Sequence, residues 1–246
     1  MGKYIYGIIE EDKQREFDFP GFEEAKVYTI NYQALAAVVS DVDAEEIYPT
    51  RRNVSAHTRV QEGLMKEYAL LPMSFGVVSR DADKVKKLLG KNYAAFKSQL
   101  RRVKGKVEWG VKVFWEKEAM VKELEGENSE LTKLKARISA APPEQAQDML
   151  IQAGKLVERM TQQWKVKYTK QIYNSLKELS VDARLNDPID IKNILNASFL
   201  VDKSNERKFD SRVYELDSRY GDKVKLKFVG PFPPYSFVNL KIEGVE

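Results

Sequence analysis

The sequence predicts an α+β fold with two α+β domains, the second of them a modified ferredoxin-like domain. Segments with a period-two apolar pattern alternate with segments of helical period throughout the 246 residues. The second half has the order strand, helices, strand, strand, helix, strand, which is the split β-α-β order with inserted helices. We expect an N-terminal domain over residues 1–104 and a C-terminal domain over 105–246 that ends in a strand tail.

Three strands are expected at the start of the chain. They cover residues 3–9, 25–30 and 35–39, with a turn at Pro20-Gly21 between the first two. The third is a continuous apolar run, which is typical of an interior strand. An acidic loop over residues 41–46 follows.

A helix and a short strand come next. We expect Asn53 to cap a helix that runs to about residue 68. Its apolar stripe comprises His57, Val60, Leu64 and Tyr68 at helical spacing. Residues 70–78 are short, apolar and interrupted by Pro72, which fits an edge strand. Asp81 or Asp83 then caps a helix expected to reach about residue 103.

The second half begins with an alternating segment over residues 107–115, which predicts a strand. A short helix is expected at about residues 129–139, and the prolines at 142 and 143 open a long one. The remaining expected elements are strands at 181–186 and 194–202, a helix at about 205–220 and a strand at 224–229.

The segment 230–237 is rich in proline and aromatic residues. Proline cannot donate to a sheet ladder, so we expect the preceding strand to end at residue 229. A strand-like alternation resumes over residues 236–242. The Pro231–Pro234 frame also fits a polyproline ligand, but its position between two strand patterns favours docking inside the protein.

Composition excludes several classes of protein. Hydrophobic residues make up 43% and charged residues 32%, as in soluble globular proteins. The absence of cysteine removes disulfides, thiolate catalysis and cysteine-based zinc sites. No apolar run approaches the roughly 20 residues that span a bilayer, and no signal peptide is recognisable, so we expect a cytoplasmic protein without a lipid membrane partner.

Catalytic and metal-binding patterns are mostly missing. The sole histidine, His57, is the one candidate base, and its place on an apolar stripe favours a buried, hydrogen-bonded residue. The carboxylate pairs at 45–46, 116 and 118, and 123 and 125 are interpreted as solvated faces. Asp41 and Asp43 provide too few oxygen ligands for a cation. No cofactor and no metal are predicted.

The charge balance argues against nucleic acid. A net charge of +4 arises from 41 basic and 37 acidic residues that are interspersed. A ferredoxin-like domain invites a single-stranded RNA-binding hypothesis, but residues 194–201 lack the paired aromatics that base stacking needs. Trp109, Trp115 and Trp164 are interpreted as packing residues.

Several separated segments together resemble one family, the gas vesicle protein F/L family, with the F type the closer match. They are residues 4–8 (YIYGI), the helix with Asn53 and His57, 71–77 (LPMSFGV), 105–113 (GKVEWGVKV) and 230–237 (GPFPPYSF). The chain departs from the family pattern at Ser74 and Val77, where many members carry Arg and Thr. The motif residues taken as structural or partner-binding are His57, Pro72, Phe75, Gly76, Glu108, Gly110, Lys112, Gly230, Pro231, Pro233, Pro234, Tyr235 and Phe237.

The resemblance implies a non-enzymatic accessory or minor structural protein of gas vesicles, the gas-filled buoyancy organelles of some prokaryotes. Its implied partners are the small hydrophobic major shell protein and other gas vesicle accessory proteins. The implied role is to limit aggregation of that subunit or to nucleate the shell. Expected binding surfaces are a strand at 236–242, the strand edge at 72–78 and the cleft between domains. The alternatives are an RNA-binding module and an enzyme that uses His57 as base.

Overall fold

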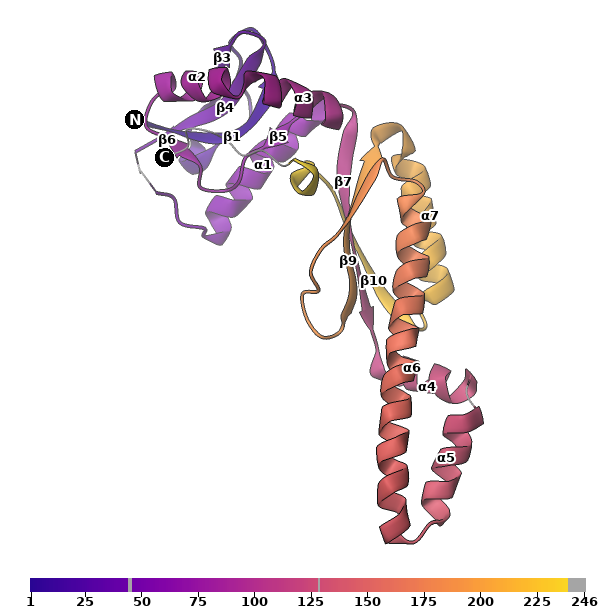
Figure 1. Ribbon diagram of the computed structural model, residues 1–246. Coiled ribbons are helices and arrows are strands. Elements are labelled where there is room, and N and C mark those ends of the chain that lie inside the picture. Colours follow the sequence, from indigo (N-terminus) through magenta and orange to yellow (C-terminus); the bar gives the residue numbers. More distant parts are fainter. Residues whose placement is uncertain (44–45, 128, 239–246) are drawn as a thin grey trace. The chain divides into compact units, whose positions relative to one another are not determined.

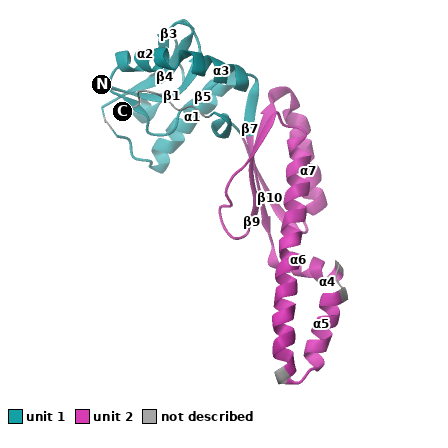
Figure 2. Cartoon of the chain, in the orientation of Figure 1, with its two compact units in different colours: residues 1–108, 231–246 teal, residues 109–230 magenta. Residues whose placement is uncertain are grey.

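The computed structural model describes residues 1–43, 46–127 and 129–238. The chain forms two compact units, which are coloured separately in Figure 2. Unit 1 comprises residues 1–108 together with 231–246, and unit 2 comprises residues 109–230. The division predicted from the sequence, at residues 104 and 105, stays a prediction.

Unit 1 is built on a six-stranded antiparallel sheet of order β2-β3-β4-β1-β5, in which β6 also pairs with β1. The strands are β1 (Gly2–Glu10), β2 (Glu16–Phe17), β3 (Val27–Tyr32), β4 (Leu35–Val42), β5 (Leu71–Pro72) and β6 (Val78–Ser79). Strand β4 lies inside the sheet, between β3 and β1. Its apolar run is buried on both faces, as predicted, because alternate residues enter two different cores.

Helices cover both faces of this sheet (Figure 1). The helices are α1 (Arg51–Glu67), α2 (Ala82–Lys91) and α3 (Tyr93–Val103), with a short 3₁₀ turn, η1, at Phe22–Glu24. Val85 and Phe96 bring α2 and α3 onto one face, while Val60 and Leu64 bring α1 onto the other. The second core is rich in aromatic rings, among them Tyr4 and Tyr6 of β1.

Three predictions for unit 1 are wrong in detail. The cap of α1 is Thr50, whose hydroxyl accepts a hydrogen bond from Asn53 N at 3.2 Å. Residues 70–78 form two short strands instead of one, because β5 and β6 pair with different parts of β1. The helix after Asp81 breaks at Asn92, whose φ of −105° and ψ of 12° separate α2 from α3.

Of the two residues expected to cap this helix, Asp81 and Asp83, the cap of α2 is Asp81, whose carboxylate accepts from Lys84 N at 2.7 Å. Asp81→Ala should therefore lower the free energy of unfolding by about 1 kcal/mol, because a first-turn N–H loses its partner. Lys87→Ala, on the exposed side of the same helix, is the control and should change it by less than about 0.5 kcal/mol. Urea unfolding of the three proteins measures both values; equal losses in the two variants would contradict the cap.

Unit 2 carries a four-stranded antiparallel sheet of order β10-β7-β9-β8. The strands are β7 (Lys106–Trp115), β8 (Asp182–Leu185), β9 (Asn193–Asp202) and β10 (Val224–Phe232). The helices are α4 (Lys117–Glu127), α5 (Ser129–Ala140), α6 (Pro143–Lys177) and α7 (Glu206–Tyr220), with a 3₁₀ turn, η2, at Lys203–Asn205. Among the described residues, no helix is both long and apolar enough to pass through a membrane.

The core of unit 2 lies between its sheet and the helices α6 and α7 (Figure 1). Tyr168 and Ile172 of α6 and Phe209 of α7 are fully buried there against Phe199 of β9. Two of the tryptophans interpreted as packing residues are clear cases: Trp164 is buried, and Trp109 stacks on Phe228 at 4.3 Å between ring centres. The α+β class predicted from the sequence is confirmed in both units.

Helix α4 is an element that the sequence pattern missed. Its buried apolar residues are Met120 and Leu124, a single helical turn apart. So short a stripe does not stand out from the surrounding charged residues.

The proline-rich segment follows a different path from the predicted one. Strand β10 continues through Pro231 to Phe232 because it is an edge strand, where the missing N–H of proline disturbs no ladder. Residues Tyr235–Phe237 then form a 3₁₀ turn, η3, so the strand predicted from residue 236 is wrong at its start. The rest of that prediction, from residue 239 on, lies outside the described residues.

Candidate functional site

The predicted motif residues fall into two groups. Those of unit 1 are His57, Pro72, Phe75, Gly76, Glu108, Pro231, Pro233, Pro234, Tyr235 and Phe237. Those of unit 2 are Gly110, Lys112 and Gly230. In unit 1 the structure brings most of the group to one buried polar cluster, which sequence spacing alone does not show.

The centre of this cluster is a chain of hydrogen bonds through His57. The hydroxyl of Tyr4 lies 2.8 Å from His57 Nδ1, and His57 Nε2 lies 3.2 Å from the carbonyl oxygen of Met73. A carbonyl only accepts, so Nε2 carries the proton and Tyr4 donates to Nδ1. Gly76 N donates to the same Tyr4 hydroxyl at 3.1 Å. Both nitrogens of the imidazole are therefore engaged.

Burial keeps this histidine neutral. His57 is 4% exposed, and desolvation is the main cause that lowers the pKa of His57 to about 4, against the opposing effect of the Met73 hydrogen bond. Burial likewise raises the pKa of the Tyr4 hydroxyl above its ordinary value. Both groups are uncharged at neutral pH.

Gln61 extends the chain to the C-terminal segment. It is fully buried on α1, one turn after His57, and its amide donates to Tyr6 O at 2.6 Å and to Met73 O at 3.0 Å. Its amide oxygen accepts from the hydroxyl of Tyr235. Burial, helped by the carboxylates of Glu62 and Glu108, raises the pKa of Tyr235 to about 12. A polar residue at position i+4 from His57 on an apolar stripe was the signal for Gln61 that the sequence analysis did not use.

Glu108 fixes the same segment by a second contact. Its carboxylate accepts from Ser236 N at 2.7 Å and from the Ser236 hydroxyl at 2.5 Å, and the side chain is 5% exposed. Phe237, the residue after Ser236, is fully buried, and Pro233 and Pro234 are buried as well. Docking of the segment inside the protein is thereby confirmed. We call Glu108, Gln61 and the residues 233–237 the C-terminal clasp.

The 71–77 segment forms the wall of the cluster. Pro72 pairs with Gly7 at the sheet edge, and the ring of Phe75 lies 5.7 Å from that of His57. Gly76 has φ of 90°, a backbone conformation that other residues rarely adopt. This backbone conformation directs the Gly76 N–H toward the Tyr4 hydroxyl, which explains why glycine occurs at this position.

The arrangement is suited to positioning chain segments. Among the described residues that form hydrogen bonds with His57 there is no carboxylate, and the one hydroxyl, that of Tyr4, is buried with a raised pKa and is therefore a poor nucleophile. The described residues contain no group of three metal-ligating side chains that could hold an ion. The cluster instead joins α1, β1, residues 73–76 and the C-terminal clasp.

One carboxylate interpretation needs correction. Glu123 of α4 does not lie on a solvated face, because it accepts from Trp164 Nε1 and from the Tyr168 hydroxyl, each at 2.7 Å. Burial opposes its ionisation, but these hydrogen bonds outweigh that effect and hold the pKa of Glu123 below its usual value. Glu123 thus ties α4 to α6.

The three motif residues of unit 2 lie on β7 and β10, which run side by side. A Cβ atom added to Gly110 would approach Val229 Cγ2 to 3.0 Å, so the glycine permits close packing there. Lys112 follows on the same strand and is half-buried. Gly230 has φ of 137°, which favours glycine on β10.

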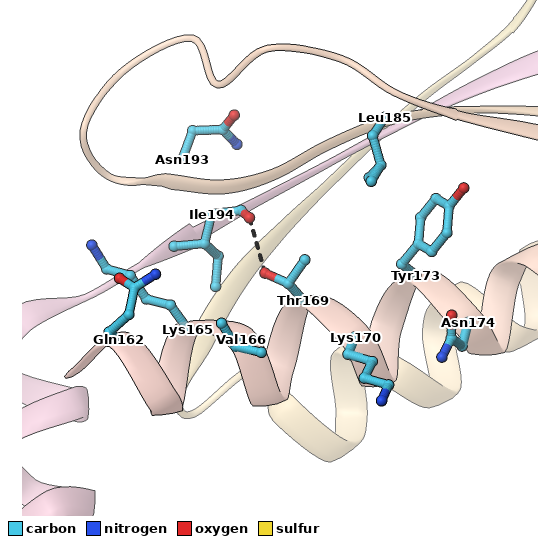
Figure 3. Close-up of a pocket in the computed structure, with 10 residues that line it drawn as sticks. All are labelled: Gln162, Lys165, Val166, Thr169, Lys170, Tyr173, Asn174, Leu185, Asn193 and Ile194. Atoms are coloured by element: carbon cyan, nitrogen blue, oxygen red, sulfur yellow. Dashed lines mark hydrogen bonds between the residues drawn. The ribbon is translucent and has the colours of Figure 1, made fainter. Parts of the chain in front are cut away.

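Unit 2 also has an open groove between α6 and the strands β8 and β9 (Figure 3). Its volume is about 490 Å³. Figure 3 shows Leu185 projecting from the strands and Tyr173 from α6, and the Thr169 hydroxyl of α6 donating to Ile194 O of β9 at 2.9 Å. Leu185 is 62% and Val166 55% exposed, so apolar surface is open to solvent here.

Comparison with known proteins supplies the family. A family model described as gas vesicle synthesis protein GvpL/GvpF matches residues 2–239. The chain is 31% identical to gas vesicle protein F1 of Halobacterium salinarum, over 97% of this chain and 93% of that protein. It is also 31% identical to gas vesicle protein F of a Streptomyces species, over 97% and 100% of the two chains. The crystal structure of gas vesicle protein GvpF from an Anabaena species shares the fold, with a TM-score of 0.84 at 24% identity over 98% and 99% of the chains.

Proposed function

The chain belongs to the gas vesicle synthesis protein GvpL/GvpF family, and from this premise we propose that it binds the major hydrophobic shell protein during vesicle assembly. It limits aggregation of the shell subunit or nucleates the shell, as an accessory or minor structural protein without enzymatic activity. It acts in the cytoplasm and associates with the vesicle shell. Other gas vesicle accessory proteins are its further candidate partners.

The physical need for such a protein supports this role. A shell that encloses gas has to present an apolar face, and that face self-associates in water before the shell is complete. A partner that covers the face transiently lowers the concentration of aggregating subunits. The absence of a catalytic arrangement around His57 makes the enzyme alternative the weaker one.

The groove of unit 2 is the observation that carries the proposal. It combines exposed apolar side chains, Leu185 and Val166, with the edge strand β8. An edge strand can pair with an added strand of a partner, and the adjoining apolar groove can take up its side chains. This surface replaces the strand expected at 236–242, whose described part is a 3₁₀ turn.

The decisive experiment joins binding to vesicle formation. The chain should co-purify with the shell protein and should reduce light scattering of dilute shell protein. Vesicles should be absent or malformed in a strain that lacks the chain. Normal vesicles in that strain, together with no co-purification, would rule out the assembly role.

A substitution in the groove should separate this surface from the rest of the chain. Leu185→Asp places a charge among apolar contacts and should weaken binding of the shell protein about tenfold or more. Leu150→Asp is the matched control, since Leu150 is 57% exposed on α6 and does not line the groove. Binding is measured by pull-down at graded shell protein concentration; equal binding of the two variants would place the contact elsewhere.

We also propose the finer description of the fold. Residues 105–246 form a modified ferredoxin-like domain with inserted helices, and residues 1–104 form a separate α+β domain. The strand order β10-β7-β9-β8 supports the first assignment, because it is the order that a split β-α-β arrangement produces.

A further inference from the structure

One face of the unit 2 sheet is left open by its helices. Figure 1 shows α6 and α7 on the same side of this sheet. Side chains alternate along a strand, so every second residue of β7 and β10 faces away from the helices. Trp109, Val111 and Phe228 belong to the helix-side core. The residues on the other side, which we call the basic face, are Gly110, Lys112, Phe114, Lys225, Lys227 and Val229.

Two contacts between the strands support this assignment. Gly110 lies against Val229, because a Cβ atom added to Gly110 would lie 3.0 Å from Val229 Cγ2. Lys227 Nζ lies 4.9 Å from the centre of the Phe114 ring. Residues 110–114 of β7 and 225–229 of β10 therefore share one continuous surface.

Within unit 2 the basic face carries three lysines and no acid; Glu108, which precedes it on the same side of β7, accepts two hydrogen bonds from Ser236. Within the part of the chain that the structure describes, no carboxylate lies within ion-pair distance of Lys112, Lys225 or Lys227. Like charges on neighbouring strands repel each other and reduce sheet stability. Such a cluster gains free energy when an anionic group approaches.

We propose that the basic face binds an acidic segment of a protein partner that also carries apolar side chains. The lysines supply charge complementarity, and Val229, which is 42% exposed, supplies an apolar contact between them. This site is separate from the groove beside β8 and does not depend on binding of the shell protein.

The structure favours an acidic protein segment over a single-stranded nucleic acid. Base stacking requires an open aromatic ring, whereas Phe114 is half-buried and the ammonium group of Lys227 lies over its ring. Phe114 is also the sole aromatic residue among the six of the basic face.

The test uses the full chain and a fluorescein-labelled peptide of alternating Glu and Val, followed by fluorescence anisotropy. The unmodified chain should bind the peptide, more weakly as salt is added. The triple variant Lys112→Gln, Lys225→Gln, Lys227→Gln should bind it at least about tenfold more weakly. The variant Lys84→Gln, Lys87→Gln, Lys91→Gln, with the same charge change on exposed positions of α2, should bind it as the unmodified chain does.

Circular dichroism checks that the variants are folded. If the variant Lys112→Gln, Lys225→Gln, Lys227→Gln is unfolded, the single variant Lys227→Gln is used in its place. Three results would overturn the proposal. They are no binding of the peptide by the unmodified chain, equal binding by the two triple variants, and displacement of the peptide by oligouridine at lower concentration than by unlabelled peptide.

Discussion

Lowering the pH from 6.5 to 4 should remove about 3 kcal/mol of the free energy of unfolding through His57 alone. Burial lowers the pKa of His57 from 6.5 to about 4, so in this range the unfolded chain binds a proton that the folded chain does not. The contribution is therefore complete above pH 6.5 and declines as the pH falls toward the folded pKa. Protonation would also place a hydrogen on Nδ1, where the Tyr4 hydroxyl now donates.

The measurement is urea unfolding at a series of pH values, for the unmodified chain and for His57→Gln. Carboxylates with lowered pKa, such as Asp41 and Glu123, lose their contributions at still lower pH in both proteins. The difference between the two curves therefore isolates the histidine. It should shrink as the pH falls below 6.5; a difference independent of pH would show that His57 does not titrate as described.

Glu108→Ala should lower the free energy of unfolding by about 2–3 kcal/mol. The substitution removes a buried carboxylate that accepts two hydrogen bonds and leaves the N–H of Ser236 without that partner. We also expect the C-terminal clasp to open, so that proteases cut the segment near residue 233 faster than in the unmodified chain.

Two further variants serve as comparisons for Glu108→Ala, and both should lose less stability. Ser236→Ala keeps the backbone hydrogen bond to Glu108 and should cost only about 1 kcal/mol. Glu116→Ala, at an exposed position, should change stability by less than about 0.5 kcal/mol. Chemical unfolding and limited proteolysis provide the two readings. If Glu108→Ala matches Glu116→Ala in both, the clasp does not hold the segment.

Much of the fold could be predicted from local pattern. The apolar run of β4 indicated an interior strand, and the alternation along β7 indicated a strand with one buried face. Helix α6 followed from its opening prolines and its apolar stripe. Errors arose where pairing with a distant strand decides the outcome, as in the division of residues 71–79 into β5 and β6.

The candidate site was less accessible from the sequence. His57 was correctly interpreted as a buried, hydrogen-bonded residue, because its place on an apolar stripe is local information. The hydrogen bond between Gln61 and Tyr235 was not predictable, because Gln61 and Tyr235 lie 174 positions apart in the chain. The role of Glu108 was missed for the same reason, at a separation of 128 positions from Ser236.

The α+β class, the order of most elements and, through the motif segments, membership of the gas vesicle family were all apparent from the amino-acid sequence. Each of these depends on residues close together in the chain, whose periodicity or identity can be read directly. The contacts of the proline-rich segment with Glu108 and Gln61, and the shared sheet face of three lysines, became visible in the folded structure alone. Such contacts depend on which strands pair and which faces the helices cover, and burial of apolar surface across the whole unit sets that choice.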